Sequence, residues 1–191
     1  PISCPEVPTG EGGLGLKITD FHGTETLLAR DFEEAGKYFV HATITSATAD
    51  AGGAVTVAFK VEDDDGLPVI GVTGADFNIV KLVPAAGGES YNKWVAYIYR
   101  TQTVADSASG DWPNPDGTTA YQAYRESEGT FTDHGDGSYS YVFVANLSNA
   151  TVNGTPITYD RTLTHRVSLM FGGGSGPTAD ATFDFVPDGS A

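Results

Sequence analysis

Alternation of apolar and polar residues is the feature of this sequence that most constrains its fold. Across residues 54–61, every second residue is a large apolar one: Val55, Val57, Phe59 and Val61. A period of two places these side chains on one face of an extended strand, and it does not fit a helical turn of about 3.6 residues. The same alternation occurs across residues 138–144. The chain is therefore predicted to consist of β-strands that each bury one face.

The composition supports an all-β fold. A chain of 191 residues has the length of a single domain. Thr, Val and Ile far outnumber Leu and Met, and 24 glycines and 10 prolines supply turns. We predict an Ig-like or Greek-key β-sandwich, or a split barrel, of seven or eight short strands. The expected strands are residues 38–45, 54–61, 67–70, 77–83, 93–100, 138–144, 163–171 and 182–186.

Two parts of the chain are distinguished by composition. Residues 1–36 are predicted to be a Pro/Gly-rich leader, in which residues 24–35 have the spacing of a short helix. Residues 37–191 are predicted to be the Ig-like domain. A long polar loop around Trp112 is expected within it, and an exposed aromatic there would suit docking. Because the chain starts at Pro1, it is expected to be a processed product or a piece of a longer protein.

Charge and cysteine content exclude several classes of protein. A net charge of −15 argues against nucleic-acid binding and against charge-driven docking on anionic membranes. No apolar run reaches the ~18–20 residues of a membrane-spanning helix. Cys4 is the single cysteine, so an internal disulfide, a Cys-Xaa-Xaa-Cys-His haem site and a Cys-rich zinc site are all excluded. Cys4 is either a free thiol or pairs outside this chain.

Few residues suggest chemistry within the chain, and we expect it not to be an enzyme. Asp63 and Asp65, and Asp133 and Asp136, are weak calcium candidates, although solvated turns explain these acidic clusters better. The four histidines lack the spacing of a zinc hydrolase. No nucleophile elbow or phosphate-binding glycine loop is present, so no catalytic residue is assigned.

Several motifs together resemble a known family. Residues 61–72 and 133–141 resemble the turn-and-strand segments of bacterial Ig-like modules, with Tyr139 in the place of a tyrosine that caps a turn. Four further segments occur in order: FNIVKLVP (77–84), WVAYIY (94–99), YDRTLTHRV (159–167) and DFVPDG (184–189). This series resembles the amino-terminal, haem-free β domain of the outer-membrane decahaem c-type cytochromes of the OmcA/MtrC family, over residues 38–189.

The resemblance implies a part in extracellular electron transfer at the outer-membrane or extracellular surface of a bacterium. It implies that haem c is carried by an adjoining module or partner, because this chain has no haem-attachment motif. The domain would then act as a scaffold and interaction surface for a multihaem module or subunit. It would bind no nucleic acid and insert into no membrane. His134 and His165 are the candidates for contact with a neighbouring haem.

Two other functions remain open on sequence alone. One is a bacterial Ig-like adhesion or binding module unconnected with haem, and the other is a carbohydrate-active β-sandwich enzyme. Two structural expectations do not depend on that choice. Arg166 should be held by a carboxylate or by backbone carbonyls. The residues expected in the core are Val55, Val57, Phe59, Trp94, Tyr141, Phe143, Val167 and Leu169.

Overall fold

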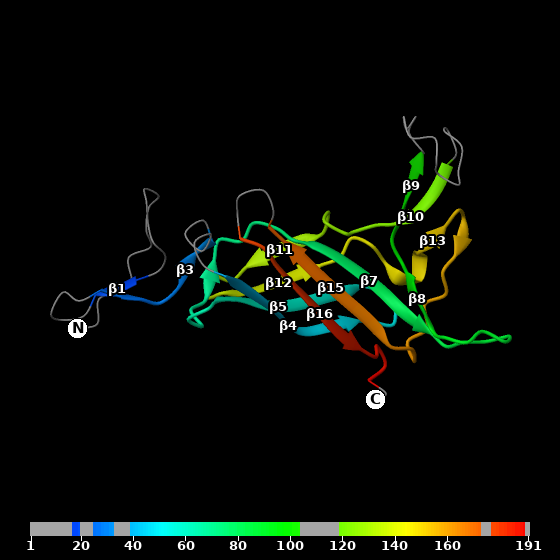
Figure 1. The fold of residues 1–191 in the computed structure, drawn as a ribbon, viewed down its shortest axis with the longest axis horizontal. Helices are drawn as coiled ribbons and strands as arrows, with labels where there is room; N and C mark the ends of the chain where they lie inside the picture. Colours follow the sequence, from blue (N-terminus) through cyan, green and yellow to red (C-terminus); the bar gives the residue numbers. More distant parts are fainter. Residues whose placement is uncertain (1–16, 20–24, 33–38, 104–118, 173–176, 190–191) are drawn as a thin grey trace.

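Two antiparallel four-stranded sheets face each other in the computed structural model, which describes residues 17–19, 25–32, 39–103, 119–172 and 177–189. The first sheet has the order β11 (Thr130–Asp133), β12 (Ser138–Val142), β5 (Val55–Asp63), β4 (Val40–Ala49). The second has the order β16 (Ala179–Phe185), β15 (His165–Phe171), β7 (Asp76–Val83), β8 (Lys93–Ala96). The two layers can be followed in Figure 1. The all-β prediction is confirmed, and the sheets form a sandwich rather than a closed barrel.

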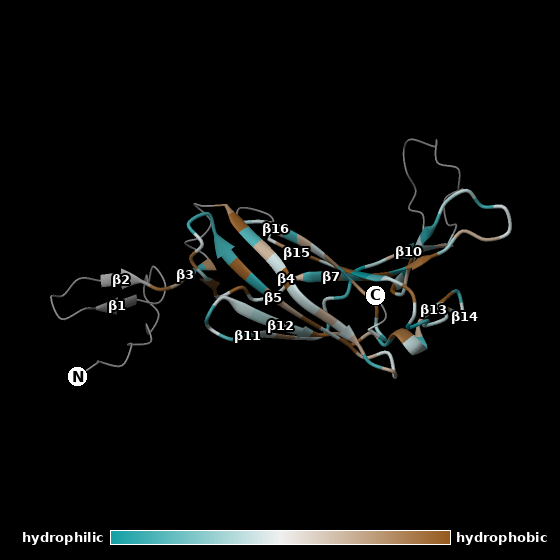
Figure 2. Cartoon of the chain, turned by 90° about the horizontal axis from the view of Figure 1, so that it is seen from below, coloured by the Kyte–Doolittle hydropathy of each residue, from teal (hydrophilic) through white to brown (hydrophobic). Residues whose placement is uncertain are grey.

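The core lies between the two sheets, where the inward side chains of both meet. Apolar and polar residues alternate in bands along the strands (Figure 2). Aromatic rings fill the centre of the core. The Phe77 ring stacks on the Tyr141 ring with 4.1 Å between their centroids, and it packs edge-on against the Phe59 ring with 6.0 Å between centroids. The predicted core residues are buried with one exception, Trp94: they are Val55, Val57, Phe59, Tyr141, Phe143, Val167 and Leu169.

Trp94 is the residue for which the core prediction is wrong. Its side chain is 42% exposed, while its neighbour Val95 packs against the core. Strand β8 has only four residues and lies at the edge of its sheet. Side chains alternate between the two faces of a strand, so an error of one residue in the predicted alternation exchanges the buried and the exposed residues. Trp94 and Ala96 therefore face outward from the second sheet.

Short strands replace the helix that was expected within residues 24–35. Strand β2 (Glu25–Leu27) pairs with β1 (Lys17–Thr19), and β3 (Arg30–Asp31) pairs in parallel with β6 (Val69–Ile70). Phe32, just after β3, packs edge-on against Phe171 at 5.8 Å. The helix prediction is thus wrong from Glu25 to Asp31, because backbone pairing with distant segments overrides the local spacing of Leu27, Leu28 and Phe32.

The remaining elements lie at one end of the sandwich. The expected strand 93–100 is interrupted: after β8 the chain enters β9 (Tyr99–Thr103), which pairs with β10 (Thr119–Ala123) in a ribbon that projects from the sheets (Figure 1). A short 3-10 helix, η1 (Leu147–Asn149), precedes the hairpin of β13 (Thr151–Val152) and β14 (Thr155–Pro156). Trp112, Cys4 and His22 lie outside the described residues. Within the described part of the chain, no helix is long and apolar enough to span a membrane.

Candidate functional site

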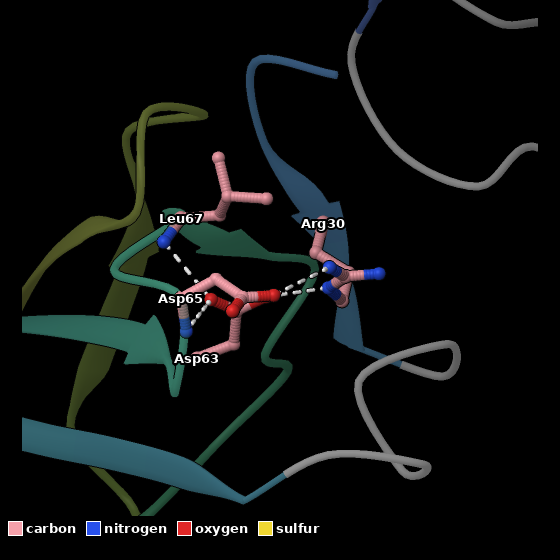
Figure 3. A network of polar contacts seen from close by, with 4 residues as sticks. All are labelled: Arg30, Asp63, Asp65 and Leu67. Carbon is pink, nitrogen blue, oxygen red and sulfur yellow. Dashed lines mark hydrogen bonds and ion pairs between the residues drawn. The ribbon is translucent and has the colours of Figure 1, made fainter.

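The first acidic cluster of the sequence is a structural turn centred on Asp63. Its buried carboxylate accepts backbone N–H bonds from Asp65 at 3.0 Å and Leu67 at 2.9 Å. A third bond comes from Arg30 Nε at 2.6 Å, which joins strand β3 to the end of β5 (Figure 3). Burial raises the pKa of Asp63, but the bonds from Arg30, Leu67 and Asp65 outweigh this effect and hold it below its usual value. The carboxylate is therefore neutralised by Arg30 and by backbone donors.

The second acidic cluster is also a turn, between β11 and β12. Asp133 accepts N–H bonds from Gly135 at 2.7 Å and Gly71 at 2.8 Å, and Asp136 accepts one from Ser138 at 2.9 Å. Among the described residues, no group of three or more His, Cys, Asp or Glu side chains is placed to hold a metal ion. Three of the four calcium candidates, Asp63, Asp133 and Asp136, thus accept hydrogen bonds within the protein. The fourth, Asp65, is exposed, and its carboxylate lies 3.9 Å from the Arg30 guanidinium.

Tyr139, at the start of β12, binds the segment of residues 69–72. Its buried hydroxyl donates to the Val69 carbonyl at 2.7 Å and accepts from the Val72 N–H at 3.4 Å. The expected hydrogen bond to backbone is present, although it reaches a segment about 70 residues away rather than the adjacent turn. Tyr141 makes the shorter-range link, because its hydroxyl accepts the Gly129 N–H at 2.7 Å. Burial raises the pKa of Tyr141 to about 12.

The two histidines predicted to approach a haem are placed very differently. His134 is exposed, and its Nε2 lies 3.1 Å from the Ser140 hydroxyl. His165 is fully buried between the sheets. Its Nδ1 lies 2.8 Å from the Leu163 carbonyl and its Nε2 lies 2.8 Å from the Tyr97 hydroxyl. Neither ring nitrogen of His165 therefore faces outward.

The environment of His165 keeps its ring neutral. Since a carbonyl only accepts, Nδ1 donates to Leu163, and Nε2 accepts from Tyr97. Burial, and to a smaller extent the nearby Lys81 ammonium, hold the pKa of His165 below its usual value, against the opposing effects of the Leu163 carbonyl and Asp160. Lys81 is itself 7% exposed, and its ammonium donates to the Thr158 carbonyl. This polar cluster was not expected from the sequence, although Lys81 shares the strand parity of Phe77 and Ile79.

An open depression of about 450 Å³ lies between the β9–β10 ribbon and the β13–β14 hairpin. Its lining contains no carboxylate, histidine, lysine or cysteine that would transfer a proton or attack a substrate. Its lining residues are Tyr99, Thr101, Tyr121, Thr151, Val152, Asn153 and Gly154.

The outer face of the second sheet carries the most organised surface group. Arg166 donates from Nε and Nη2 to the two oxygens of Asp184, at 2.6 and 2.7 Å. The same guanidinium lies over the ring of Trp94, with its central carbon 4.6 Å from the ring centroid. The predicted carboxylate partner of Arg166 is thus confirmed. The contact with Trp94 was not expected, because Trp94 was assigned to the core.

Comparison with known proteins identifies the family of this fold. The model of the OmcA-like N-terminal domain matches residues 41–191. The chain belongs to the OmcA-like N-terminal domain family. It is 29% identical over 147 residues to the multiheme cytochrome MtrC of Shewanella baltica (strain OS185), covering 73% of this chain and 19% of MtrC.

Solved structures of two relatives show the same architecture. The outer membrane decaheme cytochrome OmcA superposes with a TM-score of 0.70 at 33% identity, over 84% of this chain and 24% of OmcA. The crystal structure of MtrC from Shewanella baltica OS185 has the same fold, with a TM-score of 0.55 at 23% identity, over 80% of this chain and 23% of MtrC. This OmcA-like domain therefore spans about a quarter of the length of these relatives or less. The predicted family resemblance is confirmed.

Proposed function

We propose that this chain is the haem-free scaffold and interaction domain of an extracellular multihaem cytochrome that takes part in extracellular electron transfer. The family match over residues 41–191 is the observation that carries this proposal. OmcA is named as an outer-membrane decahaem cytochrome, and the likeness to it supports a location at the bacterial cell surface. The partner would be a multihaem module of the same polypeptide, or a multihaem subunit.

The chemistry of the chain supports action by contact rather than by redox change. With one cysteine and no Cys-Xaa-Xaa-Cys-His sequence, the chain cannot attach haem c covalently. Between the sheets, stacked rings and branched aliphatic side chains fill the interior at close-packed contact distances. Electron transfer would then run through haems outside the domain, and the domain would contribute its surface. Of the two candidate histidines, His134 is the one exposed enough to approach such a haem.

Haem content of the complete protein tests the proposal. We expect a pyridine haemochrome assay of the full-length protein to detect several c-type haems per polypeptide. After proteolysis, mass spectrometry should find every haem-bearing peptide outside the 191 residues described by this sequence. A full-length protein with no haem, or one composed of further Ig-like repeats, would instead establish the adhesion or binding module unconnected with haem.

A further inference from the structure

One end of the outer face of the second sheet is apolar and lies outside the described core cluster. Val80 and Leu82 on β7 face outward, and β-pairing places them beside Ala96 and Trp94 on β8. None of these four side chains belongs to the described core cluster or packs against it. We call this surface, together with Arg166, the Trp94 face.

The outer face of the first sheet has a different character. Its outward residues are mainly hydroxyl-bearing, with Val142 (45% exposed) as a large apolar exception; they include Thr43, Thr48, Thr56, Ser138 and Ser140. Water solvates such a face well, whereas an exposed tryptophan beside aliphatic side chains gains free energy when another surface covers it. The contrast singles out the Trp94 face as the one suited to burial in an interface.

The Trp94 face is also held ready for contact. The two bonds from Arg166 to Asp184 fix the guanidinium, and the guanidinium in turn lies over the Trp94 ring. Tryptophan and arginine are the residue types that most often dominate interface energetics, and fixing them beforehand reduces the entropy lost on binding. Nη1 of Arg166 has no acceptor among the described residues, so a partner is expected to offer a carbonyl or carboxylate oxygen there.

The chain leaves the sandwich at the same end of the same sheet. Phe185, the last residue of β16, lies in one row with His165, Lys81 and Val95 across the four strands. Beyond it, the Asp188 N–H donates to the Arg161 carbonyl at 3.2 Å, and Arg161 Nη2 donates to the Pro187 carbonyl at 3.3 Å. These bonds hold residues 187 and 188 at the same end of the sheet as the Trp94 face.

We propose that the Trp94 face docks the haem-bearing module that follows in the same polypeptide. This proposal rests on the proposed function. The matched region is only 24% of OmcA, so most of the polypeptide of such a relative lies outside it. A module covalently connected to this end of the domain would meet the face at a high effective concentration.

Hydroxyl-radical footprinting of the full-length holoprotein tests this interface, with the 191-residue chain as the reference. Met170 is the internal control, because it is 57% exposed on the outer face of the same sheet but pairs with Asp76, at the opposite end of β7. Oxidation of Trp94 relative to Met170 should fall by about fivefold or more in the holoprotein, as expected at the centre of an interface. Trp94→Ala, but not Met170→Ala, should accelerate proteolytic separation of the two modules.

Equal relative oxidation of Trp94 in the holoprotein and in the 191-residue chain would overturn the docking proposal. Protection that disappears on dilution would indicate a second copy of the chain, and it would also overturn the assigned occupant. A holoprotein that contains haem but leaves Trp94 unprotected would contradict this inference alone. A full-length protein without haem would contradict the proposed function as well, so the two failures are distinguishable.

Discussion

The substitution Phe77→Ala is expected to lower the free energy of unfolding by about 3–5 kcal/mol. Phe77 is fully buried at the middle of the sandwich. Its ring stacks on Tyr141 at 4.1 Å and packs edge-on against Phe59 at 6.0 Å and Phe143 at 5.7 Å. Alanine would remove all three ring contacts and leave a cavity between two sheets that close only partly around it.

Chemical denaturation followed by far-UV circular dichroism measures this loss. Met170→Ala is the matched control, because Met170 is on the neighbouring strand of the same sheet but is 57% exposed. The control should change the free energy of unfolding by no more than about 0.5 kcal/mol. A loss below about 1 kcal/mol for Phe77→Ala would show that the rings are not the main packing centre of the domain.

Asp63→Ala is expected to cost about 3–5 kcal/mol, because it removes one partner of a buried ion pair. The Asp63 side chain is fully buried and that of Arg30 is 12% exposed, with 2.6 Å between Nε and the carboxylate. The substitution also leaves the N–H groups of Asp65 and Leu67 without their acceptor. Asp65→Ala is the control, since that carboxylate is 71% exposed and 3.9 Å from Arg30, and it should cost less than about 1 kcal/mol.

The same carboxylate gives a pH dependence of known sign. The folded-state pKa of Asp63 is lowered, so the unfolded chain binds a proton more readily. The stability contributed by Asp63 is fully present above the unfolded pKa of about 4, and it is lost as the pH falls through the folded value. Urea denaturation between pH 5 and pH 2 should therefore show a steeper loss for the native sequence than for Asp63→Asn. If the free energy of unfolding fell equally with pH for both proteins, the result would contradict a pKa of Asp63 that is lowered by Arg30 and the backbone donors.

Strict alternation in long strands made much of the sandwich predictable. On β15 the parity that buries Val167 and Leu169 also buries His165, and it places Arg166 on the outer face. The burial of His165 was thus readable from strand parity, although we predicted this histidine as a candidate for contact with a neighbouring haem. The parity argument carries the same signal for Lys81 on β7.

The missed features depend on contacts that local sequence does not encode. Trp94, Val95 and Ala96 are all apolar, so their alternation does not show which face is inside. The pairing of Arg30 with Val69 joins residues 39 positions apart, and the spacing of apolar residues around either one does not predict it. The candidate surface formed by Trp94, Arg166 and Asp184 likewise required four strands to be placed in order, with β7 between β15 and β8.

Absorption spectroscopy and protein-film voltammetry of the purified 191-residue chain test most directly whether the domain acts by contact alone. A chain with a single cysteine and no haem-attachment motif should show no Soret band and no reversible redox wave. The tyrosines and two tryptophans should account for its near-ultraviolet spectrum. A Soret band in stoichiometric amount, or a reversible wave carried by these residues, would contradict the assignment of a haem-free interaction domain.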